Sequence, residues 1–136
     1  MKIKENQDIM IKEFTSLNGW LEKYEYLIDM GKKLPEMDKK HKTQENLVSG
    51  CQSQLWITAE LVNDKLVIFA DSDAMITKGI IAMVLSFINN HTPKEIYDSH
   101  FSFLDEMGLT TNLSPSRVNG LKSIIKRINE LCLSYM

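Results

Sequence analysis

The stretch of residues 76–88 is apolar on nearly every side of a helix, and this constrains the fold more than any other feature of the sequence. Its large apolar residues are Ile76, Ile80, Ile81, Met83, Val84, Leu85, Phe87 and Ile88. A helix of this kind has no face for solvent, so we expect it to be the central, buried helix. Ser72 and Asp73, just before it, are good N-cap residues. Gly79 costs on the order of 1 kcal/mol inside a helix relative to alanine, which predicts close approach of another backbone there.

Further helices are expected before and after this segment. Apolar residues between positions 18 and 33 fall on one helical face, and Pro35 ends that helix. A shorter helix is expected before it, around residues 9–17. After the central helix, residues 92–95 have the pattern of a capping box with proline at the first helical position. They should open a short helix that ends near Asp98.

The C-terminal part predicts two more helices. Residues 101–107 suggest a short helix closed by Gly108. Ser114 and Pro115 are typical of the start of a helix, and they precede a long amphipathic stretch. The apolar stripe of this last helix consists of Val118, Leu121, Ile125, Ile128 and Cys132.

Strand signals are confined to the middle of the chain. Apolar and polar residues alternate over positions 55–61, and residues 65–70 are rich in β-branched and aromatic types. Asn63 and Asp64 between them are typical of a hairpin turn, so the two strands should be antiparallel. Residues 45–48 could add a short third strand, which would place residues 49–53 in a loop at the edge of the sheet. We therefore expect an α+β fold, a small antiparallel sheet with helices packed on one face, in a single domain of 136 residues.

Composition argues against several classes of protein. With 43% hydrophobic and 25% charged residues the chain is typical of a soluble globular protein. No segment approaches the roughly 20 apolar residues of a membrane span, and the N-terminal MKIKENQDIM lacks the apolar stretch of a secretory signal. A net charge of −2 gives no general attraction to nucleic acid. We expect a cytoplasmic protein that binds neither membranes nor nucleic acid.

The sequence contains two cysteines, too few for a disulfide framework. Cys51 lies between Gly50 and Gln52 in LVSGCQSQLW, a polar and sterically open stretch, which makes it the candidate nucleophile. The alternative is a buried structural thiol, because free cysteine is often buried. Cys132 falls on the apolar stripe of the last helix, which predicts a packing role.

Histidine gives no independent sign of a catalytic or metal site. His41, His91 and His100 are dispersed, without helical pairing and without a cysteine at metal-ligand spacing, so no metal site is expected. A cysteine hydrolase would need a histidine within reach of Cys51 and a third group to orient it. The sequence leaves that alternative open but does not support it.

Several charged residues can be explained by a structural role alone. The basic cluster of residues 39–42 is interpreted as solvated surface, with docking to an acidic partner as the alternative. Asp71 and Asp73 are interpreted as turn and cap residues rather than as cation ligands. Arg117 lies in the first turn of the last helix, where the helix dipole disfavours a cation. It is either a surface arginine or a residue near the site.

Three long blocks of the sequence resemble the SufE family of sulfur acceptor proteins, which includes the CsdE proteins. The blocks are ENLVSGCQSQLW, ADSDAMITKGIIAMVLS and FLDEMGLTTNLSPSRVNGL. With the tyrosine-bearing second helix and Leu34-Pro35, the resemblance covers nearly the whole chain. It implies an α+β fold shared with NifU-like scaffold proteins, and a carrier that needs no cofactor of its own.

The resemblance also implies a chemistry and its partners. Proteins of this family bind a pyridoxal-phosphate-dependent cysteine desulfurase, accept its persulfide sulfur on the loop cysteine, here Cys51, and deliver it to an iron–sulfur cluster assembly scaffold. Such a transfer is thiolate attack on a persulfide. Gly50, Gln52, Asp73 and Arg117 are the residues that the resemblance implies to support the loop or to contact the partner. Gly50 would give the loop its backbone freedom.

The shared fold also suggests an alternative function, a NifU-like scaffold that itself holds a metal or a nascent cluster. Iron–sulfur clusters usually take four cysteine ligands, and this chain has two. We therefore prefer the carrier hypothesis, in which Cys51 is indispensable and Cys132 is not.

Overall fold

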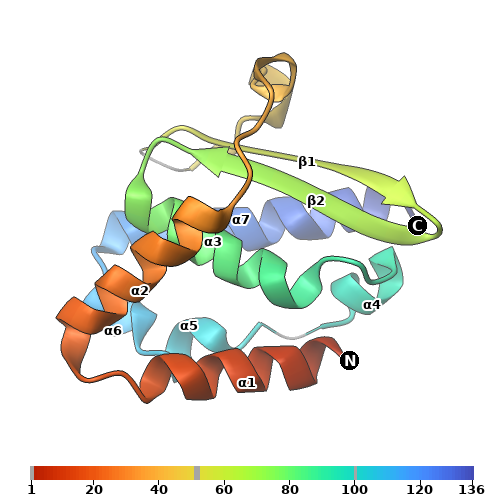
Figure 1. Ribbon diagram of the computed structural model, residues 1–136. Coiled ribbons are helices and arrows are strands. Elements are labelled where there is room, and N and C mark those ends of the chain that lie inside the picture. The colour runs from red at the N-terminus through yellow and green to blue at the C-terminus, as the bar shows by residue number, and fades with distance from the viewer. Residues whose placement is uncertain (1, 51–52, 100) are drawn as a thin grey trace.

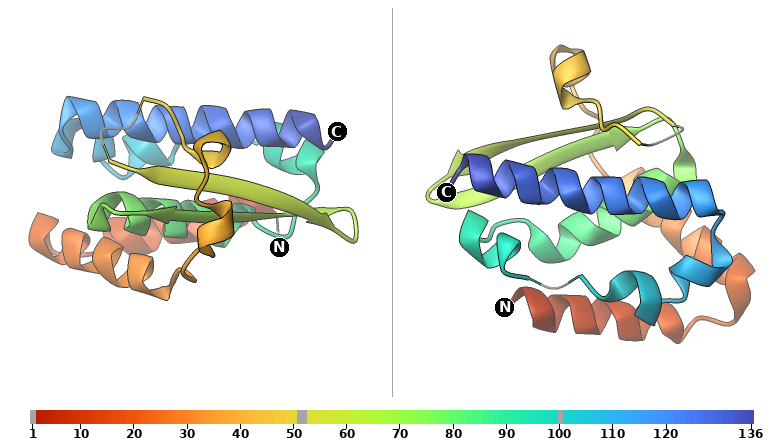
Figure 2. Two further views of the ribbon diagram at one scale, coloured as in Figure 1. Left: turned by 90° about the horizontal axis from the view of Figure 1, so that it is seen from above. Right: turned by 180° about the vertical axis from the view of Figure 1, so that it is seen from behind.

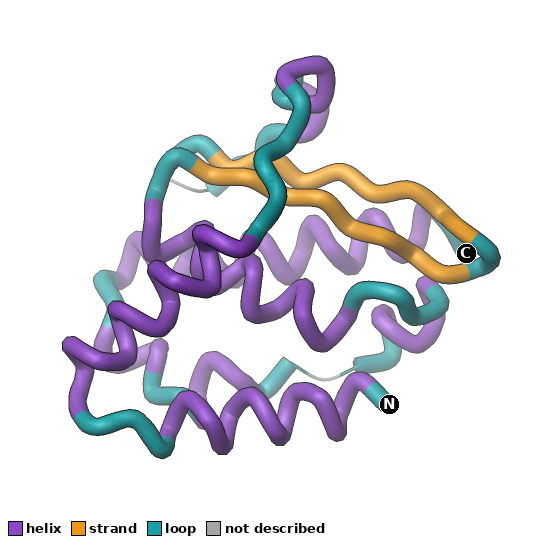
Figure 3. The backbone as a smooth tube through the Cα atoms, viewed as in Figure 1, coloured by secondary structure: helices purple, strands orange, loops and turns teal. Residues whose placement is uncertain are grey.

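Helices form most of the protein, and one β-hairpin forms its sheet (Figures 1 and 3). The structure, a computed structural model, describes residues 2–50, 53–99 and 101–136, so the predicted site residues Cys51 and Gln52 lie outside the described residues. The elements follow in the order α1 (Ile3–Thr15), α2 (Gly19–Lys33), the 3₁₀ helices η1 (Lys39–His41) and η2 (Gln44–Asn46), β1 (Leu55–Val62), β2 (Lys65–Ser72), α3 (Met75–Ile88), α4 (Pro93–Tyr97), α5 (Phe103–Glu106), α6 (Leu109–Asn112) and α7 (Pro115–Ser134).

The sheet covers one side of a layer of helices, as the sequence predicts (Figures 1 and 2). Its strands β1 and β2 are antiparallel, with Leu55 opposite Ser72. Asn63 and Asp64 at the turn have φ of 52° and 65°, a conformation that asparagine and aspartate tolerate in hairpin turns. One face of the hairpin packs on the helices and forms the core with them. The buried strand residues are Leu55, Ile57, Leu66, Ile68, Ala70 and Asp71.

Helix α3 is the central helix, as predicted. α1, α2 and α7 all contact it, and most of its residues are buried. A Cβ atom added at Gly79 would lie 1.9 Å from the carbonyl oxygen of Leu27 in α2, and one added at Gly31 would lie 3.0 Å from the Gly79 nitrogen. The predicted close backbone approach at Gly79 is confirmed. Although α3 is strongly apolar, no helix in the described part of the chain is long and apolar enough to cross a membrane.

Two predicted helix starts are confirmed in atomic detail. The Thr92 hydroxyl accepts a hydrogen bond from the Glu95 nitrogen at 3.2 Å, and the Glu95 carboxylate accepts one from the Thr92 nitrogen at 3.1 Å. This capping box opens α4, with Pro93 in the first turn. The Ser114 hydroxyl accepts from the Arg117 nitrogen at 3.3 Å at the start of α7.

The predicted cap of α3 is wrong. Ala74 occupies the N-cap position and no side chain caps the first turn; the Ser72 hydroxyl accepts a hydrogen bond from the Ala74 nitrogen at 3.1 Å, just before the helix. The Asp73 carboxylate accepts from the Gln54 nitrogen at 3.0 Å, and the Ser72 hydroxyl donates to the Gln54 carbonyl at 2.9 Å. Both side chains therefore fasten the start of β1 to the end of β2.

Three other features of the fold differ from the prediction: a helix boundary, an additional helix and a strand that does not form. α1 begins at Ile3 rather than near residue 9, because Ile3 and Gln7 are buried against the rest of the protein. A further short helix, α6, follows Gly108. Residues 45–48 do not form a third strand: η2 takes up part of them, and a single bridge joins Leu47 to Trp56.

Candidate functional site

The segment that leads into Cys51 lies against α7. Gly50, the residue before Cys51, has φ of 89°, in the left-handed region that favours glycine. A Cβ atom there would lie 2.5 Å from the hydroxyl oxygen of Ser123 in α7. The backbone conformation therefore favours glycine at this position, and any other residue would also have to displace the Ser123 hydroxyl.

Arg127 fixes the same segment further upstream. Its guanidinium donates hydrogen bonds to the carbonyl oxygens of Leu47 at 2.9 Å and Glu45 at 3.3 Å, and its Nε lies 3.9 Å from a carboxylate oxygen of Glu130. Hydrogen bonds from charged donors are roughly twice as strong as neutral ones. Sequence reasoning missed Arg127, because its acceptors are backbone carbonyls of a segment far away in the chain.

A small hollow of about 190 Å³ lies between this segment and α7. Val48, Ser49 and Gly50 form one side, and the side of α7 around Ser123 and Lys126 forms the other. The chain just before Cys51 thus borders a concave part of the surface, whose charged lining is Lys126, Arg127 and Glu130.

The segment that follows Cys51 is held by Asp73. Besides the bond from the Gln54 nitrogen to the Asp73 carboxylate, the Asp73 nitrogen donates to the Gln54 carbonyl at 3.2 Å. The structure therefore brings Gly50 and Asp73, two of the predicted site residues, to the two described ends of the loop that carries Cys51. Contact of either residue with a partner stays a prediction.

Asp71 is a buried carboxylate with a structural role that the sequence did not reveal. It is 4% exposed, and its oxygens lie 3.2 Å from the ammonium groups of both Lys42 and Lys78. The backbone nitrogens of Met37 and Ser72 also donate to it, at 3.2 and 2.8 Å. Burial by itself raises the pKa of Asp71, but these four donors outweigh it and hold the pKa below its usual value.

The interpretation of Asp71 as a turn residue and of Lys42 as solvated surface is therefore wrong. Lys42 bonds to Asp71, and its ammonium also lies 5.2 Å from the ring centroid of Trp56, a cation–π contact. Together these contacts fasten the chain before the Cys51 loop to the end of the sheet. Lys39 and Lys40 are exposed, as predicted.

Replacing Asp71 with asparagine should lower the free energy of unfolding by about 1–3 kcal/mol near neutral pH, because two lysines lose their buried counter-ion. The folded-state pKa of Asp71 is depressed, so its contribution is present above the unfolded pKa of about 3.9 and is lost as the pH falls through the folded pKa. Urea denaturation from about pH 7 down to about pH 3 should therefore show a weaker acid destabilisation in the variant. The control is Asp8→Asn, which removes an exposed pair with Lys4 and should change little. Equal stability of Asp71→Asn and wild type across that range would contradict this role.

Cys132 is buried in the core, as predicted. Its exposure is 0%, and burial raises the pKa of its thiol to about 11. Thiolate is the reactive form of cysteine, so Cys132 is nearly unreactive at neutral pH. The assignment of thiol chemistry to Cys51, the other cysteine of the sequence, stays a prediction.

His41, His91 and Arg117 do not form a second site in the described part of the chain. His91 Nδ1 lies 3.0 Å from two backbone carbonyls just after α3, His41 is exposed in η1, and His100 lies outside the described residues. Arg117 is half-buried in the first turn of α7 and makes no ion pair within the described part of the chain. Across residues 2–50, 53–99 and 101–136, no group of three or more His, Cys, Asp or Glu side chains could hold a metal ion.

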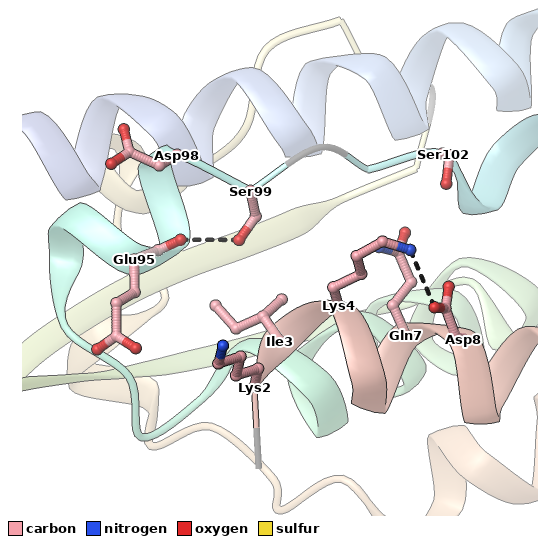
Figure 4. Close-up of a pocket in the computed structure, with 9 residues that line it drawn as sticks. All are labelled: Lys2, Ile3, Lys4, Gln7, Asp8, Glu95, Asp98, Ser99 and Ser102. Atoms are coloured by element: carbon pink, nitrogen blue, oxygen red, sulfur yellow. Dashed lines mark hydrogen bonds and ion pairs between the residues drawn. The ribbon is translucent and has the colours of Figure 1, made fainter.

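Another hollow, of about 500 Å³, lies between the start of α1 and α4 (Figure 4). Its polar side chains bond mainly to their own helices: Lys4 pairs with Asp8 at 3.0 Å, and the Ser99 hydroxyl donates to the Glu95 carbonyl at 2.7 Å. Its described lining comes from α1, α4 and the chain leading to α5, and includes nothing from residues 48–54. It is therefore separate from the Cys51 loop.

Comparison with known proteins supports the fold and shows the family. A solved structure, the solution structure of a hypothetical protein from Thermus thermophilus, superposes with a TM-score of 0.80 at 17% identity, over 96% of this chain and 95% of that one, which shows a shared fold. An uncharacterised SufE-like protein of Rhizobium etli is 38% identical over 128 residues, 90% of this chain and 86% of that protein. The model of the SufE family, an Fe–S metabolism associated domain, matches residues 8–132. Because that match spans most of the sequence, the chain belongs to the SufE family, and its role lies in iron–sulfur metabolism.

Proposed function

We propose that this protein is a sulfur carrier that works through Cys51. In the proposed reaction the Cys51 thiolate attacks the outer sulfur of a persulfide on a pyridoxal-phosphate-dependent cysteine desulfurase. The sulfur–sulfur bond of the desulfurase persulfide breaks, a new one forms on Cys51, and the desulfurase cysteine leaves as a thiolate. The carrier then delivers the sulfur to a scaffold for iron–sulfur cluster assembly, in the cytoplasm, where thiols are kept reduced.

The observation that carries this proposal is the contrast between the two cysteines. Cys132 is fully buried and its pKa is raised to about 11, so it cannot serve as a nucleophile at neutral pH. Cys51 lies in a polar segment within the matched family domain. Arg127 donates hydrogen bonds to the chain before it, and the Asp73 carboxylate accepts one from the chain after it. A loop with both ends fixed on the folded core supports a role in presenting a thiol to a partner.

The proposal predicts that the protein stimulates a desulfurase, because removing the persulfide frees the desulfurase cysteine for another turnover. Alanine release by a purified cysteine desulfurase should rise with carrier concentration and then saturate. The matched control is carrier treated with iodoacetamide without denaturant, which should block Cys51 while burial protects Cys132. Turnover that stays flat at every carrier concentration would contradict the proposal.

A further inference from the structure

A groove of about 530 Å³ lies along the exposed side of α7, next to α4. Its apolar lining is formed by Tyr97 of α4 and by Ile125 and Leu133 of α7. Tyr97 is 41% exposed and Leu133 is 54% exposed, so two large apolar side chains meet solvent in one hollow. A concave patch of this kind marks a place where another molecule can be bound. Figure 2 shows α7 running along the outside of the molecule.

Two lysines line the same groove. Lys122 and Lys126 are exposed and lie four residues apart, so they are neighbours on one face of α7. Like charges at this spacing repel each other and destabilise a helix. Neither lysine has an ion pair in the part of the chain that the structure describes. Glu130 also lines the groove, four residues after Lys126, and its carboxylate lies 3.9 Å from Nε of Arg127. The chain as a whole carries a charge of −2, so this positive strip is a local feature that carboxylates of a partner would neutralise.

The groove is continuous with the surface beside the Cys51 loop. Lys126 and Glu130 line the groove, and they also line the smaller hollow that Gly50 borders. A partner seated in the groove therefore lies beside the hollow that Gly50, the residue before Cys51 in the sequence, borders. The groove and the hollow beside residues 48–50 thus belong to one continuous surface.

We propose that this α7 groove binds an acidic segment of the cysteine desulfurase that donates sulfur to Cys51. Carboxylates of that segment lie against Lys122 and Lys126, and an apolar residue enters between Tyr97, Ile125 and Leu133. The inference rests on the proposed function and adds the chemistry of the partner's docking element. The concave shape suits a protruding helix or loop of a protein. A lipid surface would instead receive a protruding apolar helix face.

The electrostatic part is tested with the double variant Lys122→Glu/Lys126→Glu. The carrier concentration that gives half-maximal desulfurase stimulation should rise roughly tenfold at low salt, with the maximal rate unchanged, because two attractions become repulsions. The effect should nearly vanish at about 1 M salt, where the screening length falls to about 3 Å. The matched control is Lys12→Glu/Lys33→Glu, which makes the same charge change at exposed positions on α1 and α2 and should shift that concentration less than about twofold.

The apolar part is tested with Leu133→Ser. This variant should raise the carrier concentration that gives half-maximal stimulation about threefold. The rise should be equal at low and at high salt, because salt does not screen the burial of apolar surface. Leu21→Ser is the matched control, since Leu21 is 74% exposed on α2 and lies outside the groove. Far-UV circular dichroism and urea unfolding establish that all four variants are folded.

The outcomes separate this inference from the function on which it rests. If wild type stimulates the desulfurase and each groove variant matches its control, the groove proposal is wrong and the proposed function stands. If wild type gives no stimulation, the proposed function fails and the groove proposal fails with it. Sedimentation with vesicles of equimolar phosphatidylserine and phosphatidylcholine tests the lipid alternative. Vesicle binding that Lys122→Glu/Lys126→Glu abolishes, with stimulation unchanged, would assign the lysines to a membrane and overturn the proposal.

Discussion

The Cys51→Ser variant is expected to reduce desulfurase stimulation to the background rate, whereas Cys132→Ala keeps the stimulation of wild type. A serine hydroxyl is scarcely ionised at neutral pH and cannot form a persulfide, so the transfer step has no acceptor atom. Cys132 lies in the core with a pKa raised to about 11, so its loss removes no reactive thiol. Alanine is the better replacement for Cys132, because serine would bury a hydroxyl at a cost of about 1–3 kcal/mol.

The measurement is alanine release by the desulfurase at saturating carrier, with each variant checked for folding by urea unfolding. Serine is nearly isosteric with cysteine, so Cys51→Ser should fold like wild type. Equal stimulation by Cys51→Ser and wild type would remove Cys51 from the reaction. Loss of stimulation in a folded Cys132→Ala would place the chemistry or its control on the core thiol.

The Gly79→Ala variant is expected to lose about 3 kcal/mol or more of its free energy of unfolding. In an open helix the same change would stabilise the protein by roughly 1 kcal/mol, because alanine has the higher helix propensity. Here the new methyl group would lie 1.9 Å from the carbonyl oxygen of Leu27, so α2 and α3 would have to move apart. Overpacking of a rigid backbone contact costs typically 1–3 kcal/mol and occasionally more, and a clash this close belongs at the upper end.

Chemical denaturation of Gly79→Ala and Gly31→Ala measures this effect. The Cβ atom of Gly31→Ala would lie 3.0 Å from the Gly79 nitrogen, a milder contact, so its loss should be smaller. The sign of the change in the free energy of unfolding is decisive for Gly79→Ala, because helix propensity predicts stabilisation and packing predicts destabilisation. A Gly79→Ala protein as stable as wild type would mean that α2 and α3 do not approach as closely as described.

Local sequence signals predicted the periodic elements of the fold. The continuous apolar stretch of α3, the alternation in β1 and the β-branched and aromatic run of β2 were each visible in the sequence, and Gly79 marked a close approach of the α2 backbone. Helix α6 was missed because Leu109–Asn112 is a single turn, too short to show a period. Ser72 and Asp73 were misassigned as caps, because a side chain that can cap a helix can equally bond to a distant backbone group.

In the candidate site, the sequence pointed to the nucleophile but not to most of the residues that support it. Cys51 stands out by its polar surroundings and by the resemblance to the SufE family, but its supports come from three distant segments. Asp71 and Lys42 look like ordinary polar residues in the sequence, and the structure places them in one buried ion pair. Arg127 bonds to carbonyls that any sequence would supply. Contacts of this kind depend on the tertiary fold, which no local pattern encodes.

Intact-protein mass spectrometry tests the central claim most directly. Wild type, Cys51→Ser and Cys132→Ala are each incubated with a cysteine desulfurase and cysteine, and half of each sample is then reduced. The account predicts a gain of about 32 Da, one sulfur atom, that reductant removes, in wild type and Cys132→Ala but not in Cys51→Ser. A sulfur adduct on Cys51→Ser, or no adduct on any of the three proteins, would contradict it.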